Sequence, residues 1–207
     1  VHVRTLADVE RLVYTARMTP GKSRYALPAR ERILATAHEL FYRHGIRATG
    51  IDRVIAEAGV TKVTFYRHFP SKNDLILAYL EHRHRLWMDW LVEALERHRG
   101  RGRGTATRLV AVFQEWFGGE GYRGCAFINA VVELGGTVPE VTEIAVRHKH
   151  EVTDVIARML PESPDLQDHA LAITVALDGA ILRVQMEKTA ESALAALATT
   201  LRALAKG

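Results

Sequence analysis

The sequence predicts an all-α protein with a three-helix head and a larger helical body. From Ala29 onward, apolar residues recur every three or four positions, which is the period of an amphipathic helix. No segment alternates between apolar and polar residues for long enough to be a convincing strand. Between Gly59 and Pro70 a tight turn leads into a short polar helix, so the head is predicted to contain a helix-turn-helix.

The helices of the head follow from their apolar faces and their end signals. The first begins at Ala29 and ends at Gly45. Thr49 is predicted to cap the second helix, and Gly59 ends it. Thr61 is predicted to cap the third helix, which continues to residue 69 and is stopped by the proline that follows.

The rest of the chain is also predicted to be helical. Ser71 caps a fourth helix, which has no breaker before Arg99. Glycine-rich loops at residues 100–104 and 118–124 then punctuate the chain. The further predicted helices cover residues 109–117, 126–134, 139–160, 166–188 and 191–205.

Residues 22–72 are more basic than the rest of the chain. They contain ten basic and four acidic residues, whereas all 207 residues together have a net charge of only +4. A basic segment joined to a slightly acidic remainder suits a module that binds a polyanion. On charge alone, the alternative is a chance imbalance of surface charge.

Cys125 is the only cysteine, so an intrachain disulfide is impossible and a reducing compartment is expected. No apolar run approaches the roughly 20 residues of a membrane-spanning helix. The amino terminus lacks the features of a secretory signal. We therefore expect a cytoplasmic protein without a membrane partner.

Short polar side chains at the start of the third helix suit the edges of bases in the major groove of DNA. Lys62 can donate to guanine, Val63 can touch a thymine methyl group, and Thr64 can bond a base or a phosphate. Phe65 and Phe69 are better explained as apolar anchors that hold this helix on the core of the head.

A second group of residues suits phosphate oxygens. The backbone N–H groups at Thr49 and Gly50, at the start of the second helix, favour phosphate. Side chains with the same preference are Tyr66, Arg67, His68 and Lys72. Taken singly, Tyr66 could be a packed surface aromatic, His68 a capping histidine and Lys72 a solvated charge. Their placement together beside one turn favours DNA binding.

Residues 29 to about 79 resemble the amino-terminal domain of the tetracycline-repressor (TetR) family of bacterial transcriptional regulators. The matching positions are Ile33-Leu34, Ala37, Leu40-Phe41, Gly45, Thr49 to Thr61, Thr64 to Lys72, and Leu75. The resemblance implies that Thr61 to Thr64 meet bases and that Tyr66, His68 and Lys72 meet phosphates. Asp52 departs from members that carry a cation early in the second helix. Residues 123–129, Arg-Gly-Cys-Ala-Phe-Ile-Asn, are similar to a segment seen in one group of these regulators.

Three regions are therefore predicted. Residues 1–28 form an amino-terminal extension, in which Met18 could be the true start and the basic stretch from Lys22 a DNA-touching arm. Residues 29–72 form the DNA-binding domain, and residues 73–207 form a body domain for effector binding and dimerisation.

A regulator of this kind needs a two-fold partner, because one head reads too few base pairs of a (pseudo)palindromic double-stranded operator. The half-sites then lie about 34 Å apart on B-DNA. The two last helices are rich in apolar residues and offer a four-helix interface, as in the resembled family. The predicted interface residues are Val175, Gly179, Leu182, Leu194, Leu197, Leu201 and Leu204. The alternative is that both helices close the core of a monomer.

Aromatic and polar residues in the body are candidates for a pocket that takes a small, largely apolar effector. They are Trp87, Trp90, Phe113, Trp116, Phe117, Phe127, Asn129 and Glu133. Aromatic residues at helical spacing are more often plain core. An effector that prefers one separation of the two heads would release the DNA by shifting populations, with the long fourth helix as the lever. The family default is repression.

An enzyme is the main rival from another class. Gly21-Lys22-Ser23 resembles the end of a phosphate-binding loop, but Ala16 stands where a glycine is required. Cys125 has no histidine near it in the sequence, so a buried thiol is favoured over a nucleophile. We expect neither an enzyme nor a cofactor.

Two further rivals remain. His82 and His84, like His148 and His150, lie two positions apart and point to different helix faces, so solvated histidines are favoured over a metal site. A helical adaptor that binds protein partners is the last alternative. Salt-dependent retention on random DNA would separate it from a DNA-binding protein.

Overall fold

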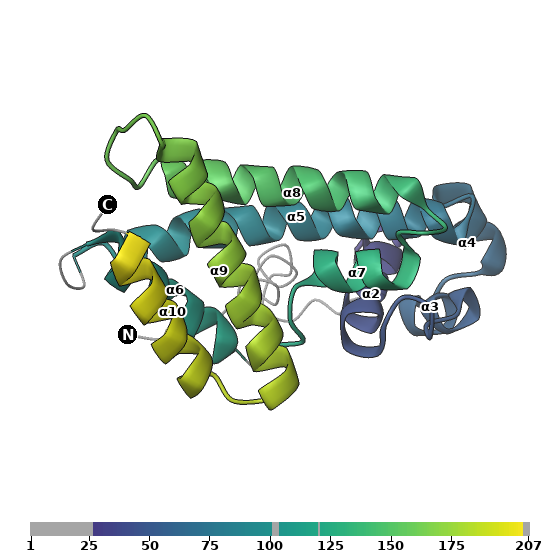
Figure 1. Cartoon of the computed structure of the whole chain (residues 1–207). Coiled ribbons are helices and arrows are strands. Elements are labelled where there is room, and N and C mark those ends of the chain that lie inside the picture. Colours follow the sequence, from purple (N-terminus) through teal and green to yellow (C-terminus); the bar gives the residue numbers. More distant parts are fainter. Residues whose placement is uncertain (1–26, 101–103, 120, 205–207) are drawn as a thin grey trace. The chain divides into compact units, whose positions relative to one another are not determined.

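The computed structural model describes residues 27–100, 104–119 and 121–204. Within these ranges all regular structure is helical, as predicted (Figure 1). The predicted extension, with Met18 and the basic stretch from Lys22, lies outside the described residues except for Leu27 and Pro28.

The helices pack as two units. The head unit contains the described residues up to 86 together with residues 126–145. Its elements are α2 (Ala29–His44), α3 (Ile51–Ala58), α4 (Lys62–His68), the first part of α5 (Lys72–Arg97), α7 (Ala126–Leu134) and the start of α8 (Pro139–Ala157). The head unit thus extends past the predicted domain boundary at residue 72, and that boundary stays a prediction about which part folds independently.

The body unit contains the described residues of 87–125 and 146–204. Its own helices are α6 (Thr105–Phe117), α9 (Leu166–Glu187) and α10 (Glu191–Leu204). Helices α5 and α8 are each continuous and contribute to both units. Compared with the predicted bounds, α7 agrees, α5 ends earlier at Arg97, α6 begins earlier at Thr105, and α8 ends earlier at Ala157.

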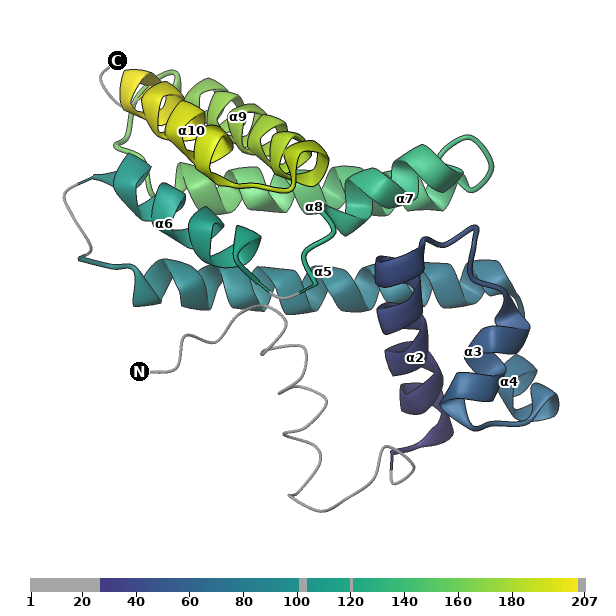
Figure 2. The same cartoon turned by 90° about the horizontal axis from the view of Figure 1, so that it is seen from below.

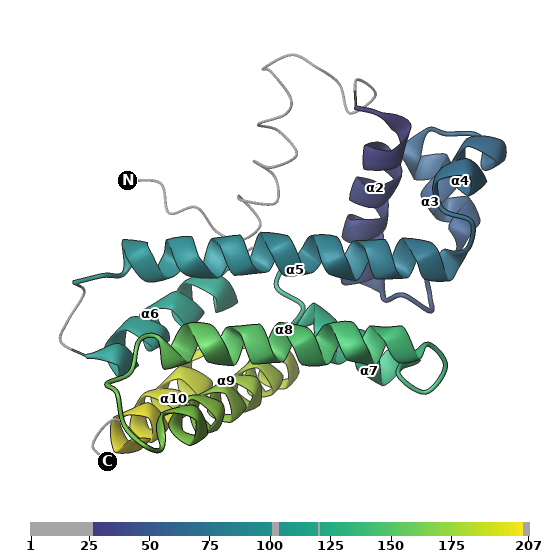
Figure 3. The same ribbon diagram turned by 90° about the horizontal axis from the view of Figure 1, so that it is seen from above.

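The core of the head unit forms where α2 crosses the first part of α5 (Figures 2 and 3). The rings of Phe41 and Tyr79 meet edge to face with centroids 5.4 Å apart. Ile33 of α2, Val54 of α3 and Phe65 of α4 are fully buried. The apolar faces read from the sequence therefore all point into one core.

A polar contact is buried within that core. Nη1 of Arg83 donates to Nε2 of His38 at 3.3 Å, and the guanidinium carbon lies 4.2 Å from the centroid of the Tyr42 ring. Burial lowers the pKa of His38 to about 3, and the nearby charge of His82 acts in the same direction. His38 is therefore neutral at ordinary pH and can accept the bond from Arg83.

Two of the three predicted helix caps are confirmed. Oγ1 of Thr61 accepts the backbone N–H of Thr64 at 3.1 Å, and Oγ of Ser71 accepts that of Asp74 at 3.1 Å. The predicted cap at Thr49 is wrong, because α3 begins after Gly50. The Thr49 hydroxyl instead donates to the carbonyl of Gly45 at 2.8 Å.

In the body unit, α9 and α10 lie side by side (Figures 1 and 2), and α10 also packs against α6. Lys149 of α8 pairs with Asp178 of α9, and Thr153 bonds Thr174 at 3.0 Å between the same helices. By length and composition, α9 is the one helix of the described residues that could cross a membrane, and 39% of its most apolar window is buried in the structure.

Candidate DNA-binding surface

The turn between α3 and α4 is held by its own backbone and by α2. Gly59 adopts a left-handed conformation with φ of 61°, which glycine tolerates without strain. Its N–H donates to Ala56 at 3.2 Å. Arg32 of α2 donates to the carbonyl of Ala58 at 3.1 Å and to that of Leu27 at 2.9 Å. A cation at the carboxyl end of α3 also stabilises the helix dipole.

Helix α4 is anchored by its aromatic residues, as predicted. Phe65 and Phe69 are 0% and 2% exposed, and their rings lie 6.2 Å apart. The guanidinium carbon of Arg30 lies 5.2 Å from the centroid of the Phe69 ring. The opposite side of this short helix therefore faces outward.

The outward side carries most of the residues predicted to read DNA. Val63 is 70% exposed, although an apolar side chain of this size is usually at least partly covered. Tyr66 is 40% exposed. Also exposed are Thr61, Lys62 and Arg67, while Thr64 and His68 are half-buried. The structure thus places this set together on one surface of the head unit.

The two predicted phosphate contacts at the start of α3 differ from each other. Gly50 is exposed and stands directly before α3, whose first backbone N–H groups are free of intrahelical partners. Thr49 is wrong as a DNA contact, because the residue is 0% exposed. Its N–H donates to Ile46 and its hydroxyl to Gly45, so it serves the turn between α2 and α3.

Lys72 is half-buried rather than a freely solvated cation. Its ammonium donates to the carbonyl of Ile46 at 2.7 Å. Burial lowers the pKa of Lys72, and the carboxylate of Glu133 acts in the opposite direction. On α7, Glu133 accepts the backbone N–H of Arg47 at 2.7 Å. Sequence reasoning missed this contact, which joins residues 86 positions apart.

The residues predicted to surround an effector are divided between the two units. In the body unit the aromatic members form one cluster: Trp87 lies 6.0 Å from Trp90 and 5.5 Å from Trp116, ring centroid to ring centroid. Phe113 and Phe117 contact Trp116 at 5.7 Å and 5.9 Å. We call these five residues the aromatic cluster.

Two residues that sequence reasoning did not include also contact this cluster. The His148 ring lies 5.1 Å from that of Trp87, and the Tyr122 ring lies 5.4 Å from that of Trp116. The indole N–H groups of Trp87 and Trp90 are buried and have no hydrogen-bond partner among the described residues. Buried indole donors usually find a partner, so these two are notable.

The other predicted effector residues belong to the head unit. Phe127 is 2% exposed and lies 6.5 Å from the ring of His84. Asn129 is half-buried on the same helix, α7. Glu133 uses its carboxylate in the contact with Arg47 described above.

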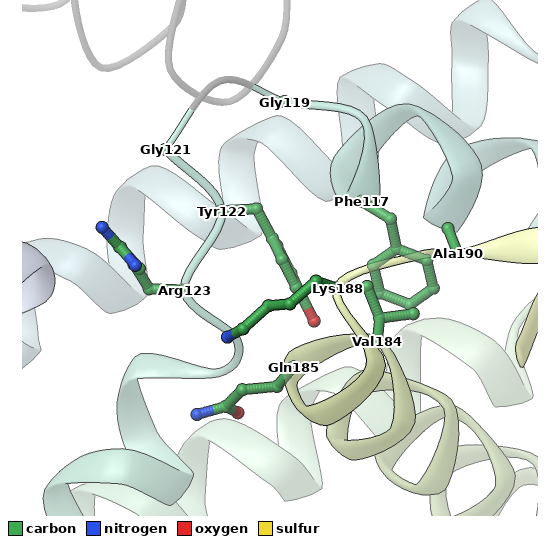
Figure 4. Close-up of a pocket in the computed structure, with 9 residues that line it drawn as sticks. All are labelled: Phe117, Gly119, Gly121, Tyr122, Arg123, Val184, Gln185, Lys188 and Ala190. Carbon is green, nitrogen blue, oxygen red and sulfur yellow. The ribbon is translucent and has the colours of Figure 1, made fainter.

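A cavity of about 240 Å³ lies in the body unit beside the aromatic cluster. It is lined by Phe117, Gly119, Gly121, Tyr122, Arg123, Val184, Gln185, Lys188 and Ala190. Figure 4 shows the side chains of Tyr122, Gln185 and Lys188 grouped together, whereas the guanidinium of Arg123 points away from them. Phe117 is the member of the predicted effector set that lines this cavity.

The predicted dimer residues on α10 need correction. Leu197 and Leu201 are 3% and 1% exposed, so they close the core of the single chain and are not available to a partner. Leu194 and Leu204 are half-buried. For Leu197 and Leu201 the alternative, closure of the monomer core, is the one that fits, whereas the interface role of Leu194 and Leu204 stays a prediction.

On helix α9, in contrast to α10, predicted interface residues are exposed. Val175 and Leu182 are 63% and 42% exposed, and Gly179 lies between them on the same face. Leu171 and Met186, which were not predicted, extend this stripe at 53% and 67% exposure. We call these five residues the α9 stripe. Their helical spacing puts them on one apolar face that the described part of the chain leaves uncovered.

The prediction that these histidines are solvated also needs correction. His84 and His148 are 9% and 2% exposed, so they are core residues rather than solvated ones. Among the described residues, groups of acidic, histidine and cysteine side chains that could hold a metal ion were not found. Cys125 is buried, consistent with a small apolar thiol.

Comparison with known proteins matches the helix-turn-helix region to a family and a larger part of the chain to individual relatives. Residues 33–79 match the family described as "Bacterial regulatory proteins, tetR family". The activator FasR of Mycolicibacterium smegmatis is 32% identical over 151 residues, which are 69% of this chain and 65% of FasR. The repressor NemR of Escherichia coli is 31% identical over 86 residues, 42% of each chain. The chain thus spans less than two thirds of these curated relatives.

Solved structures match over most of the chain. SCO4454, a TetR-family transcriptional regulator from Streptomyces coelicolor, is 32% identical with a TM-score of 0.69, covering 86% of this chain and 96% of that one. NemR in its reduced form is 22% identical, with a TM-score of 0.71 over 84% of this chain and 95% of NemR, and so shows the same fold. Since these relatives are named as regulators, an enzyme is not the class of protein indicated. On the helix-turn-helix match and on the near-complete coverage of SCO4454, this chain belongs to the TetR family.

Proposed function

We propose that the protein is a sequence-specific DNA-binding regulator of transcription that works as a homodimer in the cytoplasm. The observation that carries the proposal is the outward side of α4, where Lys62, Val63 and Tyr66 are exposed while Phe65 anchors the helix. An exposed valine can contact a thymine methyl group, and the lysine next to it can donate to a guanine. Exposure to solvent alone does not favour an apolar side chain at this position. Family membership supports the same reading.

The proposed roles follow position on the head. Lys62, Val63 and Thr64, with Thr61, read base edges in the major groove. Tyr66, Arg67 and His68 contact phosphates, as does the start of α3 at Gly50. The ammonium of Lys72 has donors beyond the one that it gives to Ile46, so it can also meet a phosphate.

Operator footprinting after genome-wide mapping of bound fragments tests this proposal. Affinity for random duplex DNA should fall steeply with salt, because bound phosphates release counterions. Val63→Ala and Lys62→Ala should change the preferred sequence, while Tyr66→Ala should weaken binding to all sequences alike. The matched control is Val132→Ala, since Val132 is 82% exposed on α7. Binding that ignores salt would instead favour the protein-binding adaptor.

We propose further that a small, largely apolar effector binds in the body unit and releases the DNA. The aromatic cluster supplies apolar surface, and the buried indole N–H groups of Trp87 and Trp90 suit a ligand that carries a hydrogen-bond acceptor. Tryptophan fluorescence during titration with a library of such compounds measures binding. Trp90→Phe keeps an aromatic side chain but removes the indole N–H together with the five-membered ring, so it should weaken the binding of ligands that accept that hydrogen bond.

Ligand-released repression is the mode that we propose. NemR is named a repressor and FasR an activator, so both outcomes occur among the relatives. In vitro transcription from the mapped promoter should decrease when the protein is added and recover with the effector. An increase on addition of the protein would make it an activator.

A further inference from the structure

One peptide group in the head unit is held from both sides by charged side chains. The carbonyl of Ile46 accepts from the ammonium of Lys72, on α5, at 2.7 Å. The N–H of the same peptide group, which belongs to Arg47, donates to Oε2 of Glu133, on α7, at 2.7 Å. Hydrogen bonds to charged groups are shorter and stronger than neutral ones. We call this arrangement the peptide clamp.

The peptide clamp lies in the turn that leads from α2 into α3. Gly45 begins the turn with a φ of +88°, which an L side chain rarely adopts. A Cβ at Gly45 would lie 3.4 Å from both carboxylate oxygens of Glu133, so the carboxylate packs closely over the glycine. The Thr49 hydroxyl then ties the end of the turn back to Gly45 at 2.8 Å. The turn is thus ordered by contacts from outside its own sequence.

This turn decides where α3 begins, and α3 supports α4 through the turn at Gly59. A displaced Ile46–Arg47 peptide would move the exposed start of α3 at Gly50, which is a proposed phosphate site. It would also free the ammonium of Lys72 from Ile46. Through this peptide group the carboxylate of Glu133 is connected to two features of the proposed DNA-binding surface, the start of α3 and the ammonium of Lys72.

We propose that Glu133 is a positioning residue for DNA binding: it fixes the Ile46–Arg47 peptide and, together with Lys72, holds the turn before α3 in its DNA-binding arrangement. This inference rests on the proposed DNA-binding function. The inference also gives α7 a role in holding the turn, because a shift of α7 away from the turn would remove the hydrogen-bond acceptor of the Arg47 N–H. An effector that moves α7 would loosen the head through this contact.

The test compares three variants with a control in the full-length protein. Glu133→Ala removes the acceptor, Glu133→Asp draws the carboxylate back by one methylene, and Glu133→Gln keeps an acceptor oxygen without the charge. The control is Glu140→Ala, at an exposed position on α8. We expect Glu133→Ala to weaken operator binding about tenfold, in line with the loss of one charge-assisted hydrogen bond. Glu133→Asp and Glu133→Gln should both be intermediate, the second because it keeps the acceptor but loses the charge, and Glu140→Ala should be close to wild type.

Hydrogen exchange of the Arg47 amide provides a readout that does not depend on DNA. Its exchange should be faster in Glu133→Ala and Glu133→Asp than in wild type, and slower in Glu133→Gln than in Glu133→Ala. Wild-type affinity together with unchanged Arg47 exchange in Glu133→Ala would overturn the inference, as would Glu133→Gln behaving like Glu133→Ala. If Glu133→Ala does not fold, the Asp and Gln variants carry the same comparison. A wild-type protein that binds no operator refutes the proposed function instead, and the Arg47 exchange still tests the contact.

Discussion

His38 shows how a single buried residue links stability to pH. It lies under α5, 4% exposed, accepts a hydrogen bond from Arg83, and contacts the ring of His82 at 5.7 Å between centroids. A proton on His38 would bring a second positive charge next to Arg83 in a buried site. The structure therefore stabilises the neutral form, and its pKa is lowered to about 3.

The lowered pKa gives a prediction with a definite sign. In the unfolded chain the pKa of His38 is near 6.5, so between about pH 3 and pH 6.5 the unfolded state binds more protons than the folded state. The contribution of His38 to stability is complete above pH 6.5 and is lost as the pH falls. Urea unfolding should show the free energy of unfolding decreasing by about 1.4 kcal/mol per pH unit from this group in that window.

The variant His38→Gln isolates this contribution. Glutamine keeps an acceptor for Arg83 but does not titrate, so its free energy of unfolding should depend less on pH between 4 and 6 than that of wild type. His150→Gln, at an exposed position on α8, serves as the control and should keep the wild-type slope. Equal slopes in His38→Gln and wild type would mean that His38 is not held neutral.

For single residues, contacts with near neighbours in the sequence could be predicted, whereas burial and contacts with distant segments could not. Thr61 caps α4 as predicted, because a cap depends on residues three positions away. Thr49 has the same local pattern but is fully buried, since Gly50 takes the position before α3 and Thr49 turns back to Gly45. The hydrogen bond from Arg47 to Glu133 could not be predicted from local sequence, because its acceptor is 86 positions away on α7.

At the element scale, apolar periodicity predicted the helices themselves, whereas the surface that each apolar face packs against did not always follow from it. In α4 the anchors Phe65 and Phe69 lie on one face, so both its position and its outward side followed from the sequence. Helix α9 is apolar on two faces, and α10 carries a leucine seam. Spacing alone does not say which apolar face the chain covers for itself. Packing against α6 and α9 decided this for α10.

Leu197 tests the corrected role of α10. Its side chain is 3% exposed, so Leu197→Ala leaves a cavity in the single chain and should lower the free energy of unfolding by about 2–5 kcal/mol. Thermal and urea unfolding measure the change. The mass in solution should stay that of wild type under conditions where the variant is folded. A folded variant that instead dissociates without losing stability would return Leu197 to a dimer interface.

For the whole molecule, DNA recognition depends on dimerisation. In the proposed function a single α4 reaches only a few base pairs, so two copies have to meet half-sites about 34 Å apart on one face of B-DNA. A two-fold axis gives this arrangement if each chain presents the same self-complementary surface. The α9 stripe is suited to that role, since Val175, Leu182 and Met186 are exposed on a helix whose opposite face is buried.

Charge on the α9 stripe should therefore abolish both dimerisation and tight operator binding. Val175 is 63% exposed, so Val175→Asp leaves the fold of one chain intact but puts a carboxylate into the proposed apolar interface, where its desolvation is costly. Gly179 beside it leaves open space at the Cβ position, which allows a second helix to approach closely.

Sedimentation equilibrium should show the mass falling toward the 23.1 kDa of one chain. Thr199→Asp, on the exposed face of α10, introduces the same charge and should remain dimeric. Operator affinity should fall with the dimer, because two heads are no longer held together. A Val175→Asp variant that sediments as a dimer would move the interface to another surface.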